Sequence, residues 1–156
     1  MANTYSRLHV HIIFAVKGRA NPIAEKWRED LYKYISGIIM NKHQKLMIIN
    51  GMTDHIHILM GFNPDSVISD IVRDIKSNSS RWINDNRFVH GKFEWQNGFG
   101  AFSVGYSNIT MVANYIQNQQ QHHRNKTFRD EFIEMLDKYH ISYKPEYLLH
   151  DYGTYE

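Results

Sequence analysis

Two short stretches of this chain alternate strictly between two kinds of side chain, which limits the folds that it can adopt. Residues 8–16 and 55–61 both carry a large apolar side chain at every second position. Successive side chains of a strand point to opposite faces of a sheet, so each stretch is predicted to be a strand with one fully apolar face. Four histidines share the other face: His9, His11, His55 and His57.

The segments between and after these strands predict the other elements from apolar spacing and turn signals. Asn50-Gly51 predicts a tight turn between two of the strands. In chain order, the further predicted elements are helix 22–39, strand 45–50, helix 68–83, strand 92–104, helix 107–121 and helix 127–139. This order is that of a ferredoxin-like split βαβ unit, an α+β fold with an antiparallel sheet.

That fold makes three predictions about the arrangement. The first and third strands are central neighbours, the first two helices cover one face of the sheet, and the four histidines lie on the face that these helices leave open. A later helix, added to the core, carries Tyr115. With no repeats and no linker, residues 1–156 are expected to form a single domain, with a core of about 5–135 and a C-terminal helix and tail over 127–156.

Composition excludes several classes of protein. The chain has no cysteine, so disulfides and thiolate metal sites are excluded and a reducing cytoplasm is expected. Its apolar runs are too short to span a bilayer, and its beginning lacks the pattern of a signal peptide. The formal charge of +2 permits a nucleic-acid partner without requiring one.

The histidine pairs allow two interpretations. Two imidazoles two residues apart on one strand face can hold a metal ion, but solvent-facing histidines on an amphipathic strand are the commoner case. Two families of phosphoesterases that use paired histidines are a poor match. They need a further histidine, or a threonine or serine, where this chain has Ile13 and Leu59.

A second pattern lies in "YIQNQ". Tyr115 and Gln119 are four residues apart, so they are predicted to be neighbours on one helix face. A tyrosine can act as a covalent nucleophile, and an amide oxygen can bind a hard cation such as Mg²⁺. Each residue alone also fits a structural role, because the chain has 10 tyrosines and "QNQQQHH" reads as a polar helix end.

Taken together, "DHIHILM", "SDIVRDIKSNSSRWI", "WQNGFGAFSV" and "YSNITMVANYIQNQ" resemble the single-tyrosine HUH transposases of the insertion-sequence-200/605 class. The resemblance covers roughly residues 5 to 135, in order and with the expected spacing. It implies that His55 and His57 bind a divalent metal, Mg²⁺ or Mn²⁺. Gln119 is then the third ligand and Tyr115 the nucleophile.

The resemblance also implies an activity. Such a protein cleaves and rejoins single-stranded DNA at hairpin-marked element ends through a 5′-phosphotyrosine intermediate, without a nucleotide cofactor. It implies a homodimer with shared active sites, in which Gly105 would be a hinge, and action at the nucleoid. Three alternatives stay open: a related protein that processes repeated palindromes, a DNA-binding protein without catalysis, and a metal-dependent phosphodiesterase.

Expectations for the remaining polar residues follow. His9 and His11 are expected to line the site without binding the metal, whereas Asp54 points to the opposite face by strand parity. His122 and His123 are expected to contact DNA, if anything. Five cations are candidates for phosphate contacts, although solvated charges on helix faces are equally common. They are Lys17, Arg19, Arg73, Lys76 and Arg81, of which Lys76 is favoured because it lies inside a matched motif.

Overall fold

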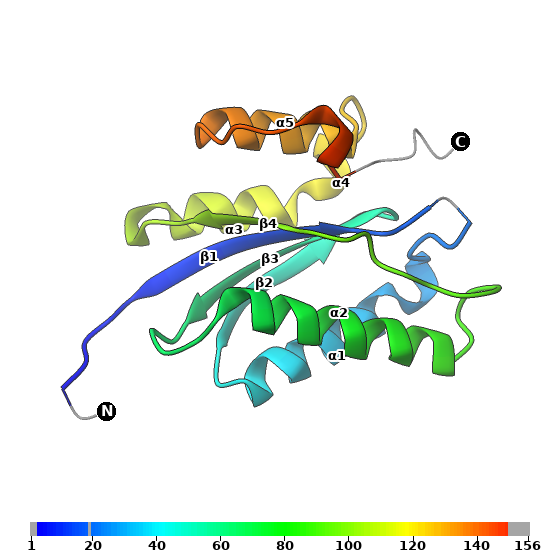
Figure 1. The fold of residues 1–156 in the computed structure, drawn as a ribbon, viewed down its shortest axis with the longest axis horizontal. Helices are drawn as coiled ribbons and strands as arrows, with labels where there is room; N and C mark the ends of the chain where they lie inside the picture. Colours follow the sequence, from blue (N-terminus) through cyan, green and yellow to red (C-terminus); the bar gives the residue numbers. More distant parts are fainter. Residues whose placement is uncertain (1–2, 19, 150–156) are drawn as a thin grey trace.

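The computed structural model describes residues 3–18 and 20–149 and is built on a four-stranded antiparallel sheet (Figure 1). The strands lie in the order β2-β3-β1-β4. They are β1 (Leu8–Ala15), β2 (Lys45–Gly51), β3 (His55–Phe62) and β4 (Gly100–Ser103). The first and third strands are therefore central neighbours, as predicted, with Ile13 opposite His57 and Ala15 opposite His55.

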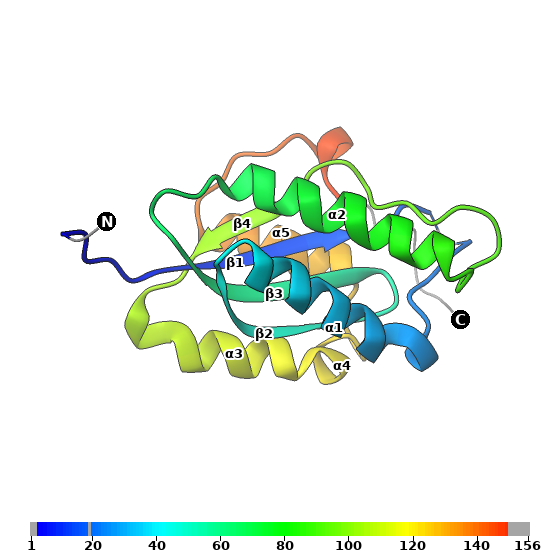
Figure 2. The same ribbon diagram turned by 90° about the horizontal axis from the view of Figure 1, so that it is seen from below.

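Two long helices, α1 (Glu25–Asn41) and α2 (Ile68–Asp85), cover one face of the sheet (Figures 1 and 2). Each has apolar side chains at helical spacing that are buried against this face. The strand residues of the same core follow the predicted parity. They are Val10, Ile12, Phe14 and Val16, with Ile56, Ile58 and Met60. Leu8 is the exception, because it lies at the strand end and is 39% exposed.

The opposite face is left open by α1 and α2, as predicted, and is covered by the C-terminal third of the chain (Figure 1). A single 3₁₀ turn (Tyr106–Asn108) leads into α3 (Ile109–Gln117), which packs beside β2 and is followed by α4 (Gln119–His122). The helix predicted over 107–121 is thus interrupted at Asn118. The chain then forms α5 (Phe128–Lys138), whose first turn is capped by Thr127, and ends with a 3₁₀ turn (Pro145–Tyr147).

Helix α5 lies on the sheet because its apolar stripe fits there. Phe128, Phe132 and Leu136 pack against apolar side chains of β1 and β4. The approach is close at Gly100, where an added Cβ atom would lie 2.7 Å from the ring of Phe132. The helix predicted over 127–139 is therefore confirmed, and it seals the face that carries the histidines.

The strand predicted over 92–104 is much shorter than expected. Only β4 pairs along its length, and one isolated bridge joins Trp95 to Val16. Between them Gly98 has a φ of 86°, which ends the extended backbone. Phe93 and Trp95 instead pack into the core beneath α1 and α2. In the part of the chain that is described, no helix has the length and apolar character to cross a membrane.

Candidate active site

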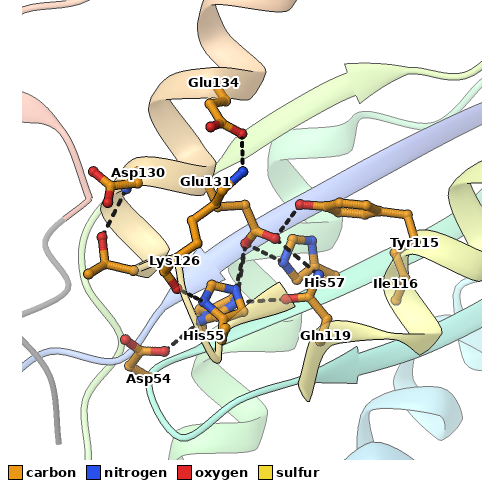
Figure 3. Close-up of polar contacts among 12 residues, drawn as sticks. Asp54, His55, His57, Tyr115, Ile116, Gln119, Lys126, Asp130, Glu131 and Glu134 are labelled. Atoms are coloured by element: carbon orange, nitrogen blue, oxygen red, sulfur yellow. Dashed lines mark hydrogen bonds and ion pairs between the residues drawn. The ribbon is translucent and has the colours of Figure 1, made fainter. Parts of the chain in front are cut away.

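Side chains from four elements meet on the face of the sheet covered by α3, α4 and α5 (Figure 3). His55 and His57 come from β3, Tyr115 from α3, Gln119 from α4 and Glu131 from α5. Tyr115 is half-buried, and the other four side chains have at most 1% of their surface exposed. The structure therefore brings together the four residues predicted from sequence and adds a carboxylate to them.

The carboxylate of Glu131 is the centre of this cluster. Its Oε1 lies 3.0 Å from Nε2 of His57 and 3.4 Å from Nε2 of His55. Its Oε2 accepts a hydrogen bond from the phenol of Tyr115 and another, at 3.1 Å, from the amide of Gln119. The amide oxygen of Gln119 lies 3.1 Å from Nε2 of His55. Although Asn118 interrupts the helix, both Tyr115 and Gln119 therefore reach the same group.

Two neighbours hold the histidine rings in place. Nδ1 of His55 lies 2.6 Å from the carboxylate of Asp54, and Nδ1 of His57 lies 2.8 Å from Nε2 of His11. The expectation that Asp54 points away was wrong, because β3 begins only at His55 and strand parity does not apply to the residue before it. His11 lines the site, as expected. His9 lies near the start of β1 and borders a separate recess, with Arg7 and Lys45.

Burial and mutual contacts shift the protonation equilibria of the cluster. Burial opposes the charge on His55, but hydrogen bonds to Asp54 and Glu131 outweigh it and raise the pKa of His55 to about 9. Burial also opposes the charge of Glu131, yet hydrogen bonds from the surrounding histidines hold its pKa far below the ordinary value. Burial, with the charge of Glu131, raises the pKa of Tyr115 well above that of a free phenol.

The donor set fits a metal ion. One ligand atom from each of His55, His57 and Glu131 lies within 4.8 Å of the others, and all three residues are buried. Imidazole nitrogens and a carboxylate oxygen are common ligands of divalent transition metals. Glu131 was missed in the sequence, although a signal existed. It occupies a position in the apolar stripe of α5, between Phe128 and Phe132, where a carboxylate needs buried partners.

His123, for which the sequence suggested only a contact with DNA, also lies at the site. Its Nε2 lies 3.1 Å from Oε1 of Glu131. His123 reaches Glu131 because the chain turns after α4 and carries this residue back over the sheet. His122, the preceding residue, stacks on the ring of Tyr115 with the ring centres 4.5 Å apart.

Three of the five predicted DNA-contacting cations line one surface groove. The groove has a volume of about 720 Å³ and runs between α2 and residues 92–99. Arg73 and Arg81 are exposed along it, whereas Lys76 donates hydrogen bonds to the carbonyl oxygens of Gln96 and Gly98. Burial lowers the pKa of Lys76 to about 8. Of the other two, Lys17 pairs with Glu94, and Arg19 is outside the described residues.

The sheet order, the paired histidines and the tyrosine define a class, the single-tyrosine HUH proteins. The family described as "Transposase IS200 like" matches residues 4–119. The chain therefore belongs to the IS200-like transposases, enzymes that cleave and transfer single-stranded DNA.

Individual relatives agree with this assignment. The chain is 22% identical over 118 residues to the ISDra2 transposase TnpA of Deinococcus radiodurans. The alignment covers 72% of this chain and 84% of the relative.

Two solved structures share the fold. A protein of Deinococcus radiodurans R1 assigned as a transposase aligns with a TM-score of 0.60 and 24% identity, over 75% of this chain and 94% of that one. A REP-associated tyrosine transposase bound to a REP hairpin aligns with a TM-score of 0.60 and 14% identity, over 98% of this chain and 92% of that one.

Proposed function

We propose that this chain cleaves and rejoins single-stranded DNA at hairpin-marked element ends, through a 5′-phosphotyrosine intermediate on Tyr115. One observation carries the proposal. The phenol of Tyr115 and the imidazoles of His55 and His57 all contact a single buried carboxylate, that of Glu131. A potential nucleophile and a potential metal site therefore contact the same side chain.

The proposed reaction exchanges one phosphodiester for another. The phenolic oxygen of Tyr115 bonds to the scissile phosphorus, and the bond from phosphorus to the 3′ oxygen breaks. The proton lost by the phenol is balanced by the one gained by the leaving 3′ hydroxyl. Because a phosphodiester is kept throughout, a second DNA 3′ hydroxyl can reverse the step, and no nucleotide cofactor is needed.

His55, His57 and Gln119 are the proposed metal ligands for Mg²⁺ or Mn²⁺, as the family pattern suggests. When bound, a divalent cation would polarise the scissile phosphate and stabilise the leaving oxygen. Asp54 and His11 support this role, because each fixes one ring through Nδ1 and leaves Nε2 facing the centre of the site.

The site is covered by Glu131 and α5, so it must open before DNA can react. The phenol of Tyr115 is hydrogen-bonded to Glu131, and the histidines are fully buried beneath α5. A DNA phosphate reaches Tyr115 only after Glu131 withdraws from the phenol. We therefore propose that α5 moves when single-stranded DNA binds, which protection of its amides from hydrogen exchange would report.

The groove beside α2 is the proposed contact surface for the DNA backbone. It presents Arg73 and Arg81, and cations of this kind supply most of the affinity for nucleic acids. Lys17 and Arg19 remain candidates for further phosphate contacts.

A second candidate function is the processing of repeated extragenic palindromes. One observation favours it: the neighbour solved with a REP hairpin aligns with 98% of this chain, so its likeness extends through the C-terminal helices. The two candidates share their chemistry and differ in the hairpin that they use. Hairpins from the flanks of the chain's own gene and from genomic palindromes, tested side by side, would separate them.

The test uses single-stranded DNA labelled on the 3′ side of the expected cleavage position, mixed with protein and Mg²⁺ or Mn²⁺. A denaturing gel should show label on the protein for the wild type and none for Tyr115→Phe. Tyr106→Phe is the matched control, because Tyr106 precedes the same helix and is 68% exposed. Release of labelled product without a protein adduct would instead support a hydrolytic phosphodiesterase. Binding without cleavage would support a protein that has lost catalysis.

A further inference from the structure

We propose that His123 is an additional imidazole ligand of the metal held by His55 and His57, so that the centre contains three histidines. The inference rests on the proposed function, because it concerns the same metal. It departs from the ligand set that the sequence predicts, in which Gln119 is the third ligand and His123 has no role.

The first observation is the convergence of three ring nitrogens. Nε2 of His57, His123 and His55 lie 3.0, 3.1 and 3.4 Å from one atom, Oε1 of Glu131. A single oxygen thus lies at the point toward which all three rings are directed. The ligand atoms of His55, His57 and Glu131 lie within 4.8 Å of one another, and His123 joins this group through its contact with Glu131, so metal binding would draw the His123 ring further inward.

The second observation concerns the ring nitrogens that face away from the centre. Nδ1 of His55 lies 2.6 Å from the carboxylate of Asp54, and Nδ1 of His123 lies 2.8 Å from the carbonyl oxygen of Lys126. Both partners can only accept hydrogen bonds, so both Nδ1 atoms carry the hydrogen. Nε2 is then the atom of each ring that faces the carboxylate of Glu131, with a proton when the ring is charged and with a lone pair when it is neutral.

A lone pair that faces a carboxylate repels it unless a positive charge lies between them, which is either a proton on Nε2 or a metal cation that replaces that proton. A divalent cation supplies that charge while leaving both rings neutral, and histidine ligands in proteins commonly have such an acceptor behind the second nitrogen. Asp54 and the carbonyl group of Lys126 fill this supporting role for His55 and His123 respectively. Glu131 is then positioned to neutralise the cation or to bind it directly.

The neighbouring histidine offers a matched comparison. His122 belongs to the same short segment, but its ring stacks on Tyr115 and makes no contact with Glu131 among the contacts of the described residues. Substitution of His122 therefore changes the same part of the chain without removing a converging nitrogen.

Three imidazoles also change the metal preference. Nitrogen ligands favour Co²⁺ over Mg²⁺, whose preferred ligands are oxygens. The wild type should therefore bind Co²⁺ much more tightly than Mg²⁺, and loss of one imidazole should reduce that difference.

The test is titration of the full-length protein with Co²⁺ in the absence of DNA, followed by calorimetry and by the visible absorption of the bound ion. His123→Ala should weaken Co²⁺ binding by roughly 10- to 100-fold, the range found even for groups that only support ligands. It should also change the absorption of the bound Co²⁺. His122→Ala should leave both close to wild type, and thermal unfolding should confirm that each variant is folded.

The outcomes separate this inference from the proposed function. In one outcome, His55→Ala and His57→Ala abolish Co²⁺ binding, whereas His123→Ala binds Co²⁺ as tightly as the wild type and with an unchanged spectrum. His123 is then not a ligand, but the metal site of His55 and His57 is supported. If none of the three variants affects binding, the metal site itself is wrong. Should His123→Ala fail to fold, pulsed electron paramagnetic resonance of bound Mn²⁺ in the wild type with ¹⁵N-labelled histidine decides. Coupling to three imidazoles supports the inference, and coupling to two overturns it.

Discussion

The phenol of Tyr115 on α3 donates a hydrogen bond to the carboxylate of Glu131, 16 residues further along the chain on α5. The same carboxylate contacts the ring nitrogens of His55 and His57. One side chain therefore connects the proposed nucleophile to the proposed metal ligands. It also ties α5 to the sheet at the site, so that local chemistry and the stability of the C-terminal region are coupled.

Substitution of Glu131 should destabilise the metal-free protein. Glu131→Gln removes one of the two carboxylates that stabilise the buried charge of His55, the other being Asp54, and loss of one member of a buried pair costs about 3 kcal/mol. Urea unfolding at pH 7, with a chelator present, would measure this loss of unfolding free energy. Glu134→Gln is the control, since Glu134 lies one turn further along α5 and its ion pair with Lys126 is exposed. Glu134→Gln should lower the unfolding free energy by at most about 0.5 kcal/mol. Equal losses for both would show that Glu131 has no special role.

Substitution of Gln119 should impair cleavage less than substitution of either strand histidine. Gln119→Ala removes one oxygen near His55, whereas His55→Ala or His57→Ala removes an imidazole ligand. The cleavage defect of Gln119→Ala should be partly restored at high Mn²⁺, because Mn²⁺ tolerates nitrogen ligands better than Mg²⁺. Adduct formation across a titration of both metals checks this. A defect in His11→Ala larger than in His55→Ala would mean that the wrong pair was assigned.

The arrangement of Tyr115 allows a test of the expected shared active sites. The structure places Tyr115 and His57 of one chain together, with ring centres 6.1 Å apart, so one chain suffices to assemble the site. Mixed dimers of His57→Ala and Tyr115→Phe chains should therefore be inactive, because each site carries one lesion. Co-expression with two different tags and an adduct assay provides the measurement. Cleavage by the mixed dimer, with both parent homodimers inactive, would establish sites shared between subunits.

Two cations of the groove should affect different properties, Arg81 the binding of DNA and Lys76 the stability of the fold. Arg81 is exposed and bonded only to Asn78 among the contacts seen, so Arg81→Ala should weaken binding of single-stranded DNA. It should also reduce the salt dependence of binding by roughly 0.7 in log–log slope, the value for one phosphate contact. Lys76→Ala should instead lower the stability by about 1–2 kcal/mol, because Lys76 holds the backbone at Gln96 and Gly98. An unchanged melting temperature for Lys76→Ala would contradict this assignment.

His11 should make the metal-free protein sensitive to acid. Burial, with the nearby charge of His57, lowers the pKa of His11 from 6.5 to about 3. Between these values the unfolded chain binds a proton that the folded chain does not, so stability falls as the pH falls from 6.5 towards 3. His11→Gln should reduce the slope of unfolding free energy against pH by up to about 1.4 kcal/mol per unit. His90→Gln, at an exposed position, should leave the slope unchanged. Identical slopes for His11→Gln and wild type would contradict the lowered pKa of His11.

The sequence by itself determined which strands are central in the sheet and which face of the sheet carries the histidines. Strand alternation has a period of two, so it placed Val10, Ile12 and Ile58 on one face and the histidines on the other without any tertiary information. Helical spacing likewise predicted that Tyr115 and Gln119 lie close together. The interruption at Asn118 does not separate them, since both side chains bond to Glu131.

Only the tertiary structure decided what covers the histidines. Glu131 and His123 reach the site because α4 and α5 fold back over the sheet, and contacts between residues so far apart in the chain leave no periodic pattern in the sequence. The same holds for Lys76, whose matched motif suggested a DNA contact but whose ammonium group binds carbonyl oxygens from residues 96–98. Local periodicity reports which face a side chain occupies, whereas its partner depends on how distant segments pack.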